Sequence, residues 1–140
     1  MHQNIIHNNG NKLFSFPKKE KLTSKIIIDR LFKDGQSRFK YPFRILFLSD
    51  DAYSEPFPQL VISVSKRNFK RAVDRNRIKR LIREAYRLQK EELLSLFPFK
   101  PSYVAILYTA KEEIQLEELK KKLYLIIKMT QSDNNTSNKS

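Results

Sequence analysis

The sequence predicts an α+β fold in which helices cover one small sheet, in the order helix, strands, helix, strand, helix. Three observations predict it. Apolar residues recur at helical spacing in three segments, and other segments are rich in the aromatic and branched residues typical of strands. The chain has only two glycines, no Gly/Ser-rich linker and no internal repeat, so we expect a single domain.

Composition narrows the class of partner. The 140 residues include 28 Lys plus Arg against 15 Asp plus Glu, a net charge of +13, which favours a polyanion such as nucleic acid or an anionic membrane surface. The absence of cysteine excludes disulfides, thiolate catalysis and Cys-bound zinc. The chain shows neither a signal peptide at its N-terminus nor a run of ~20 apolar residues, so we expect a soluble, cytoplasmic protein.

Both ends of the chain are polar. Residues 1–15 are rich in Asn and residues 130–140 are small and polar, so we expect two disordered tails around one folded domain over residues 16–129.

The first helix is predicted between two boundary signals. Thr23 or Ser24 is suited to the N-cap, and Gly35 is suited to a left-handed C′ position. Ile28 and Phe32 lie four residues apart, so they share one face and give this short helix a wide apolar surface.

Three segments are predicted as strands. Residues 39–49 are rich in aromatic and branched residues, and Pro42 leaves open whether they form one strand or two. Residues 59–65 alternate between an apolar and a more polar face, and antiparallel pairing with the preceding strand is the simplest arrangement. Residues 102–110 are almost continuously apolar, which indicates a strand near the centre of the sheet.

Two more helices complete the pattern. The first runs from about Arg71 to Leu96 and should be the longest helix of the chain. The second runs from about Leu116 to Met129. The expected buried positions are Ile78, Leu81, Ile82, Ala85 and Leu88 in the former, and Leu116, Leu119, Leu123, Ile126 and Ile127 in the latter.

The positive charge is concentrated in one segment. Residues 66–90 contain eleven basic and two acidic residues, a net +9 of the chain's +13. At about 100° per residue, the polar side chains of this helix fall on the face opposite the apolar stripe. That face consists of Asn76, Lys79, Arg80, Arg83, Arg87 and Lys90.

An ordinary solvated helix is the simplest alternative, but this segment lacks the acidic residues that would form ion pairs along such a face. Arg71, Arg75 and Arg77 also lie near the helix N-terminus, where the helix dipole disfavours cations and only Asp74 has the favourable sign. Arginine there is understandable if a phosphate binds, because guanidinium groups and free N–H groups can hold the same anion. We therefore favour an anion-binding surface.

These residues resemble a known family. The segment SVSKRNFKRAVDRNRIKRLIREAYR, residues 63–87, is similar to the signature of the bacterial ribonuclease P protein, with its Arg-Asn-Arg at residues 75–77. A weaker resemblance extends over about residues 16–128. The family assists a catalytic RNA that removes the 5′ leader from precursor tRNA.

The resemblance implies an α-β-β-β-α-β-α sandwich, ribosomal protein S5 domain 2-like, with about four strands and a left-handed βαβ crossover instead of the usual right-handed one. It implies a single RNA-binding domain over residues 16–129. The residues expected to bind the RNA are Lys66, Arg67, Arg71, Arg75, Asn76, Arg77, Lys79, Arg80, Arg83 and Arg87.

A second surface implied by the resemblance is a cleft between the first helix and the sheet, which receives the single-stranded leader. Ile28 and Phe32 match its helical wall, although the family commonly has aromatic residues at both positions. Ser63, Ser65 and residues 39–48 are further candidates.

The sequence offers no catalytic group. His2 and His7 fall in the predicted N-terminal tail, and Asp50 with Asp51 indicates a turn rather than a metal site. We expect no catalytic residue, no metal ligand and no cofactor on the protein itself. The resemblance places hydrolysis and Mg²⁺ on the RNA subunit.

The expected partners are ribonuclease P RNA and precursor tRNA, with no membrane and no required protein partner. The alternatives are a structural, ribosomal-type RNA-binding protein and a protein-only nuclease. A membrane-surface helix fits worse, because the apolar stripe of the basic helix is needed to cover the sheet.

Overall fold

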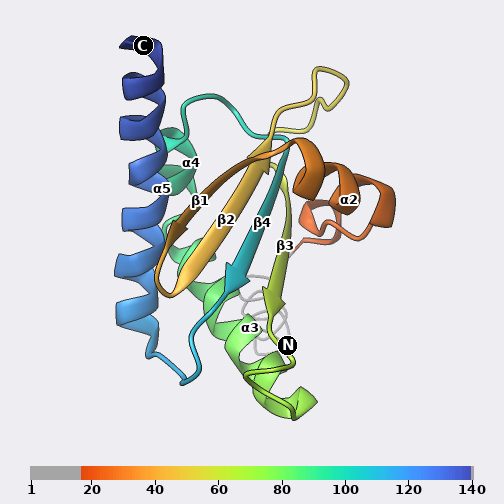
Figure 1. Cartoon of the computed structure of the whole chain (residues 1–140). Coiled ribbons are helices and arrows are strands. Elements are labelled where there is room, and N and C mark those ends of the chain that lie inside the picture. Colours follow the sequence, from red (N-terminus) through yellow and green to blue (C-terminus); the bar gives the residue numbers. More distant parts are fainter. Residues whose placement is uncertain (1–16, 140) are drawn as a thin grey trace, which may run out of the picture.

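A computed structural model describes residues 17–139, with side chains to Gln131. The predicted tail over residues 1–15 lies outside the described residues. Four strands form one sheet in the order β1-β2-β4-β3: β1 (Gln36–Lys40), β2 (Phe43–Leu48), β3 (Gln59–Val64) and β4 (Tyr103–Tyr108). Helix α2 (Lys25–Asp34) packs on one face, while α3 (Ala72–Leu88), α4 (Lys90–Leu96) and α5 (Leu116–Lys139) cover the other (Figure 1). The predicted α+β sandwich is confirmed.

The strand pairing differs in one respect from the simplest expectation. β1 and β2 form an antiparallel pair on either side of Tyr41 and Pro42, so residues 36–48 make two strands. β3, however, does not pair with β2. It runs parallel to β4, which lies between them. The predicted antiparallel pairing is wrong because β4 is the most apolar strand, and the central position buries both of its faces.

The connection from β3 to β4 has the hand that the resemblance implied. The two strands point the same way, and α3 and α4 return behind the sheet to the neighbouring strand (Figure 1). With the helices behind the sheet and both arrows pointing down, the chain moves from right to left, which makes the crossover left-handed. This arrangement leaves the end of β3 and the start of α3 projecting from one end of the sheet.

The predicted helix over residues 71–96 is two helices. α3 ends at Leu88, and Gln89 leaves the helical region with φ −135° and ψ 30° before α4 begins. The side-chain amide of Gln89 donates a hydrogen bond to the backbone carbonyl of Lys120 at 3.0 Å. This bond fixes the break between α3 and α4 to α5. Leu88, predicted as buried, is exposed because the chain turns away from the sheet directly after it.

The longest helix is α5, at 24 residues, and not the basic helix. It continues ten residues past the predicted end at Met129. Residues 130–139, predicted as part of a disordered tail, contain neither Gly nor Pro, so no backbone breaker ends the helix there.

Helix α2 begins as predicted, with Ser24 as its N-cap. The Ser24 side chain accepts a hydrogen bond from the Ile27 N–H at 3.3 Å. Gly35 is not left-handed, because its φ is −71°. Glycine is needed for space instead: a Cβ there would lie 2.5 Å from the Leu31 carbonyl oxygen and 3.2 Å from that of Phe47.

The sheet separates two apolar clusters. The larger one lies between the sheet and α3, α4 and α5, and buries Ile78, Ile82 and Ala85 of α3 as predicted. The smaller one, under α2, buries Leu31 against Leu46 and Ala105. Because α2 covers only part of its face, the rest of that side of the sheet is left accessible.

Candidate nucleic-acid interface

The uncovered part of the α2 side of the sheet is a row of four cross-strand neighbours, here called the open row. Phe39 pairs with Arg44, Arg44 with Leu107, and Leu107 with Ser63. Directly opposed residues point to the same face of a sheet. Phe39, Arg44 and Ser63 are exposed and Leu107 is half-buried. The row thus presents an aromatic ring, a guanidinium and a hydroxyl on one surface.

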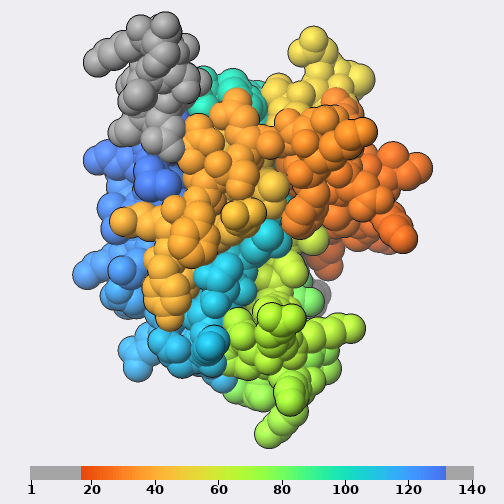
Figure 2. Space-filling model, viewed as in Figure 1, coloured from red at the N-terminus to blue at the C-terminus, as the bar shows by residue number. Residues whose placement is uncertain are grey.

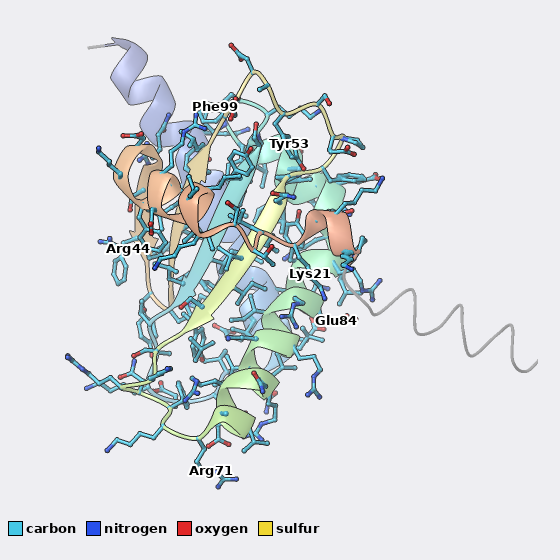
Figure 3. All side chains as sticks on the ribbon, turned by 90° about the vertical axis from the view of Figure 1, so that its right-hand side faces the viewer. Lys21, Arg44, Tyr53, Arg71, Glu84 and Phe99 are labelled. Atoms are coloured by element: carbon cyan, nitrogen blue, oxygen red, sulfur yellow. The ribbon has the colours of Figure 1, made fainter. Side chains whose placement is uncertain are left out.

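Figure 3 shows Arg44 on the same side of the sheet as α2, with Arg71 far from it at the tip of α3. Figure 2 shows the surface between them, where strands β4 and β3 come to the surface between α2 and the start of α3. The open row therefore connects the predicted leader cleft to the basic segment.

The two residues predicted for the helical wall of the cleft differ in their availability. Ile28 is half-buried against the small cluster under α2. Phe32 is 51% exposed, because Leu31 takes the buried position at this turn of the helix. Phe39 of the open row is 55% exposed. Two aromatic rings on the α2 side are thus free to contact a ligand.

The turn after β3 presents the first cations. Ser65 supports the basic loop, Lys66–Arg71. Its Oγ accepts hydrogen bonds from the backbone N–H groups of Arg67 at 3.1 Å and Asn68 at 3.4 Å. The Asn68 side-chain amide donates to the carbonyl oxygens of Thr109 and Ala110 at 3.4 and 3.3 Å. These bonds fix the loop to the end of β4, so Lys66 and Arg67 stand exposed on a braced turn.

Arg75, the first arginine of the Arg-Asn-Arg motif, braces the same loop. Its Nη1 donates to the carbonyl oxygens of Phe69 at 2.8 Å and of Lys70 at 2.9 Å. The sequence analysis assigned Arg75 to RNA contact alone, but its Nη1 also holds the basic loop in place.

The remaining predicted contacts lie along α3. Asn76 and Arg80 are exposed, and Lys79 and Arg83 are half-buried. Within residues 17–131, no acidic side chain forms an ion pair with Lys66, Arg67, Lys79, Arg80 or Arg83. No described carboxylate is in direct contact with these cations, so they are available to a ligand. The structure thus brings the predicted residues onto one continuous basic loop and helix.

Four cations of the basic segment form ion pairs, contrary to the expectation that counter-charges are missing. Arg71 contacts Asp74 at 3.7 Å, the longest of these contacts. Arg77 Nη2 donates to Asp74 Oδ1 at 2.9 Å, and its Nε donates to Glu113 Oε1 at 3.1 Å. Its Nη2 also donates to Glu113 Oε2. The hydrogen bonds to Glu113, and then those to Asp74, raise the pKa of Arg77, and the guanidinium in turn lowers the pKa of Glu113.

The other two pairs lie at the far end of α3. Arg87 binds Glu84 in the same helix, with Nη2 to Oε2 at 2.7 Å, which raises the pKa of Arg87. Lys90 belongs to α4 and not to the cationic face of α3. It binds Glu20 at 2.7 Å and lies 3.8 Å from the centre of the Phe57 ring, where it links the N-terminal turn to α4.

The sequence analysis missed Glu113 and Leu107. It named Ser63 and the segment that contains Phe39 and Arg44 as cleft candidates, but it did not place them in one row. Glu113 lies 36 positions from its partner, and no local pattern connects them. The open row depends on β4 lying between β2 and β3. The sequence indicated a central strand at residues 102–110, but not which strands lie on either side of it. The signal that could have been used is Pro42, because two strands on either side of it would bring Phe39 and Arg44 together.

Among the residues described, no group of three or more His, Asp and Glu side chains could hold a metal ion. No described helix is both long and apolar enough to cross a membrane.

Comparisons with known proteins agree with the fold and with the basic motif. The family model for ribonuclease P matches residues 16–131. A ribonuclease P protein component from Porphyromonas gingivalis is 35% identical over 95 residues, covering 68% of this chain and 69% of the relative. Another from Chlorobaculum tepidum is 37% identical over 109 residues, covering 71% and 70%.

Solved structures show the same fold. The RNase P protein of Staphylococcus aureus superposes with a TM-score of 0.64 at 22% identity, covering 79% of this chain and 94% of that one. The RNase P protein of Thermotoga maritima gives 0.63 at 23% identity, covering 79% and 96%.

Proposed function

Since this chain belongs to the bacterial ribonuclease P protein family and is the protein component of that endoribonuclease, we propose that its two surfaces hold two different RNAs. The basic loop and α3 bind the catalytic RNA. The open row, together with Ile28 and Phe32 of α2, receives the 5′ leader of precursor tRNA. Each surface has the chemistry suited to its ligand.

The observation that carries the proposal is the arrangement of charge and aromatic rings. The cations on the basic loop and α3 that form no ion pair with a described residue can neutralise phosphates in a structured RNA, and phosphate contacts dominate the affinity for such ligands. Phe32 and Phe39, in contrast, are exposed aromatic rings on the α2 side of the sheet. A single strand gains ~1 to 3 kcal/mol for each base that stacks on an aromatic ring, with little sequence preference.

The proposed RNA-binding set is the one expected from sequence, with roles refined by the contacts described above. Lys66, Arg67, Lys79, Arg80 and Arg83 bind phosphates directly. Arg75 holds the basic loop in shape, and Arg77 binds after its carboxylate partners are displaced. Arg71, Asn76 and Arg87 complete the surface. We assign Mg²⁺ and the hydrolytic step to the RNA subunit, as the family resemblance implies.

Reconstitution with the ribonuclease P RNA of the same organism tests this proposal. The protein should stimulate cleavage of precursor tRNA. Its affinity for the RNA should fall as salt is added, with a slope of several units in a plot of log K against log salt. Arg80→Ala should reduce that salt dependence by about one unit. Unchanged cleavage on adding the protein, or a binding constant independent of salt, would remove the basis of the proposal. Tight binding without stimulation would favour a structural RNA-binding role.

A further inference from the structure

The environment of Arg77 is unusual among the basic residues of α3 because two elements supply carboxylates to it. Asp74 comes from one turn earlier in the same helix, and Glu113 comes from the segment between β4 and α5. We propose that Glu113 competes with RNA phosphate for Arg77 and so lowers the affinity of the protein for RNA. This inference rests on the proposed RNA-binding role of α3.

The first argument is geometric. A guanidinium binds an oxyanion through two parallel N–H groups, from Nε with one Nη or from both Nη atoms. Glu113 occupies the first of these edges, because it accepts from both Nε and Nη2. Asp74 accepts from Nη2 at 2.9 Å, which takes one donor of the second edge. A phosphate can bind Arg77 with two hydrogen bonds only by displacing a carboxylate.

The second argument is electrostatic. Arg77 carries one positive charge, while the two carboxylates that contact it carry two negative charges. A glutamate is ionised at neutral pH, and Arg77 lowers the pKa of Glu113 further. Arg71 adds a longer contact to Asp74 at 3.7 Å. An incoming phosphate therefore meets much less positive potential at Arg77 than at Arg80.

The third argument is that the fold holds the segment containing Glu113 close to α3. The neighbouring Glu112 is held at both its groups: its backbone carbonyl accepts from the Tyr108 hydroxyl at 2.6 Å, and its carboxylate accepts from the Tyr41 hydroxyl at 3.1 Å. The segment after β4 is thus fixed to the sheet. Glu113 faces Arg77 from a braced position rather than from a loose chain.

The consequence concerns unrelated RNA. Non-specific binding is almost entirely electrostatic, so a carboxylate that cancels one cation weakens it directly. The contact is exposed, at 47% for the Arg77 side chain and 37% for that of Glu113. Exposed pairs are screened by solvent, so we expect a change of about two- to fivefold in affinity rather than orders of magnitude.

The test compares Glu113→Gln with Glu112→Gln in the full-length protein, using a duplex RNA of unrelated sequence as the probe. Both variants remove one negative charge from the same segment, and glutamine at 112 can still accept the Tyr41 hydroxyl. Glu113→Gln should raise the affinity by about two- to fivefold at low salt, clearly more than Glu112→Gln. In an Arg77→Ala background, the two substitutions should have equal effects.

Equal effects of the two variants in the wild-type background would overturn the inference. So would a loss of affinity in Glu113→Gln, which would mean that Glu113 orients Arg77 for phosphate binding instead. The proposed function has its own readout in the same experiment, namely the loss of affinity for ribonuclease P RNA in Arg80→Ala. If Arg80→Ala kept its affinity for ribonuclease P RNA while Glu113→Gln gained affinity for the duplex, the inference would hold and the proposed function would fail.

Discussion

Phe39 on β1 and Arg44 on β2 are direct cross-strand neighbours, so an exposed ring and an exposed guanidinium lie side by side on the uncovered part of the sheet. A strand of RNA can place a base on the ring and a phosphate near the cation. Phe39→Ala should therefore weaken binding of precursor tRNA by the holoenzyme by ~1 to 3 kcal/mol, measured by equilibrium titration.

The control for Phe39 is Ile26→Ala. Ile26 is an apolar residue on α2 with 81% of its surface exposed, so its removal costs little stability and touches neither the open row nor the small cluster. Its substitution should leave the affinity for precursor tRNA unchanged. Equal losses in both variants would show that Phe39 has no specific role.

The two faces of α3 should respond differently to truncation. Ile82 is fully buried against the sheet, so Ile82→Ala should lower the free energy of unfolding by about 2 to 5 kcal/mol. Arg80 is exposed and makes no ion pair with a described residue, so Arg80→Ala should weaken RNA binding at unchanged stability. Urea unfolding and RNA titration of both variants separate these effects. A large stability loss in Arg80→Ala would show that the faces have been assigned wrongly.

Arg75 should act on the shape of the basic loop. Without its guanidinium, the carbonyl groups of Phe69 and Lys70 lose their donor, so the loop should open more often. Arg75→Ala should then speed trypsin cleavage after Lys66, Arg67 and Lys70 in the free protein, read by mass spectrometry. Arg80→Ala is the matched control and should leave these rates at the wild-type value. Unchanged cleavage in Arg75→Ala would refute the bracing role.

The attachment of α2 should weaken in acid. The backbone N–H of Ala52 and then the Arg30 side chain lower the pKa of Asp50, and the Arg30 to Asp50 ion pair joins α2 to the turn after β2. A carboxyl whose pKa is lowered in the folded state stabilises it above the ordinary pKa near 4. That contribution is lost as the pH falls through the lowered value.

Asp50→Asn keeps one side-chain acceptor, for the Ala52 N–H, but loses the ion pair with Arg30 and cannot titrate. The midpoint of urea unfolding should therefore fall less steeply below about pH 4 in Asp50→Asn than in the wild type. Parallel curves would mean that other carboxylates, such as Glu113, account for the whole acid response.

The sequence predicted those features that depend on local pattern. The N-cap at Ser24, the buried stripe of Ile78, Ile82 and Ala85, and the central apolar strand are all properties of short segments, and each is confirmed. The left-handed crossover came from resemblance, since general packing rules favour the opposite hand.

The features that were missed depend on contacts between distant segments. The break at Gln89 reflects a bond to α5, and the pairing of Arg77 requires Glu113, 36 positions away. Gly35 was predicted from its conformational freedom, whereas the close approach of the Leu31 and Phe47 carbonyl oxygens explains it. The N-terminal tail and the roles of the individual site residues remain predictions.

The separation of the two RNA surfaces is tested most directly with two precursor tRNAs, one with a long leader and one with a single-nucleotide leader. The affinity of the holoenzyme for each is measured with wild-type protein, Phe32→Ala and Ile28→Phe. Phe32→Ala should weaken binding of the long-leader precursor by ~1 to 3 kcal/mol and leave the short-leader precursor unchanged. Ile28→Phe should tighten long-leader binding, unless the half-buried site is strained by the added volume. Equal losses on both precursors in Phe32→Ala would contradict the account, because they would show that Phe32 does not contact the leader.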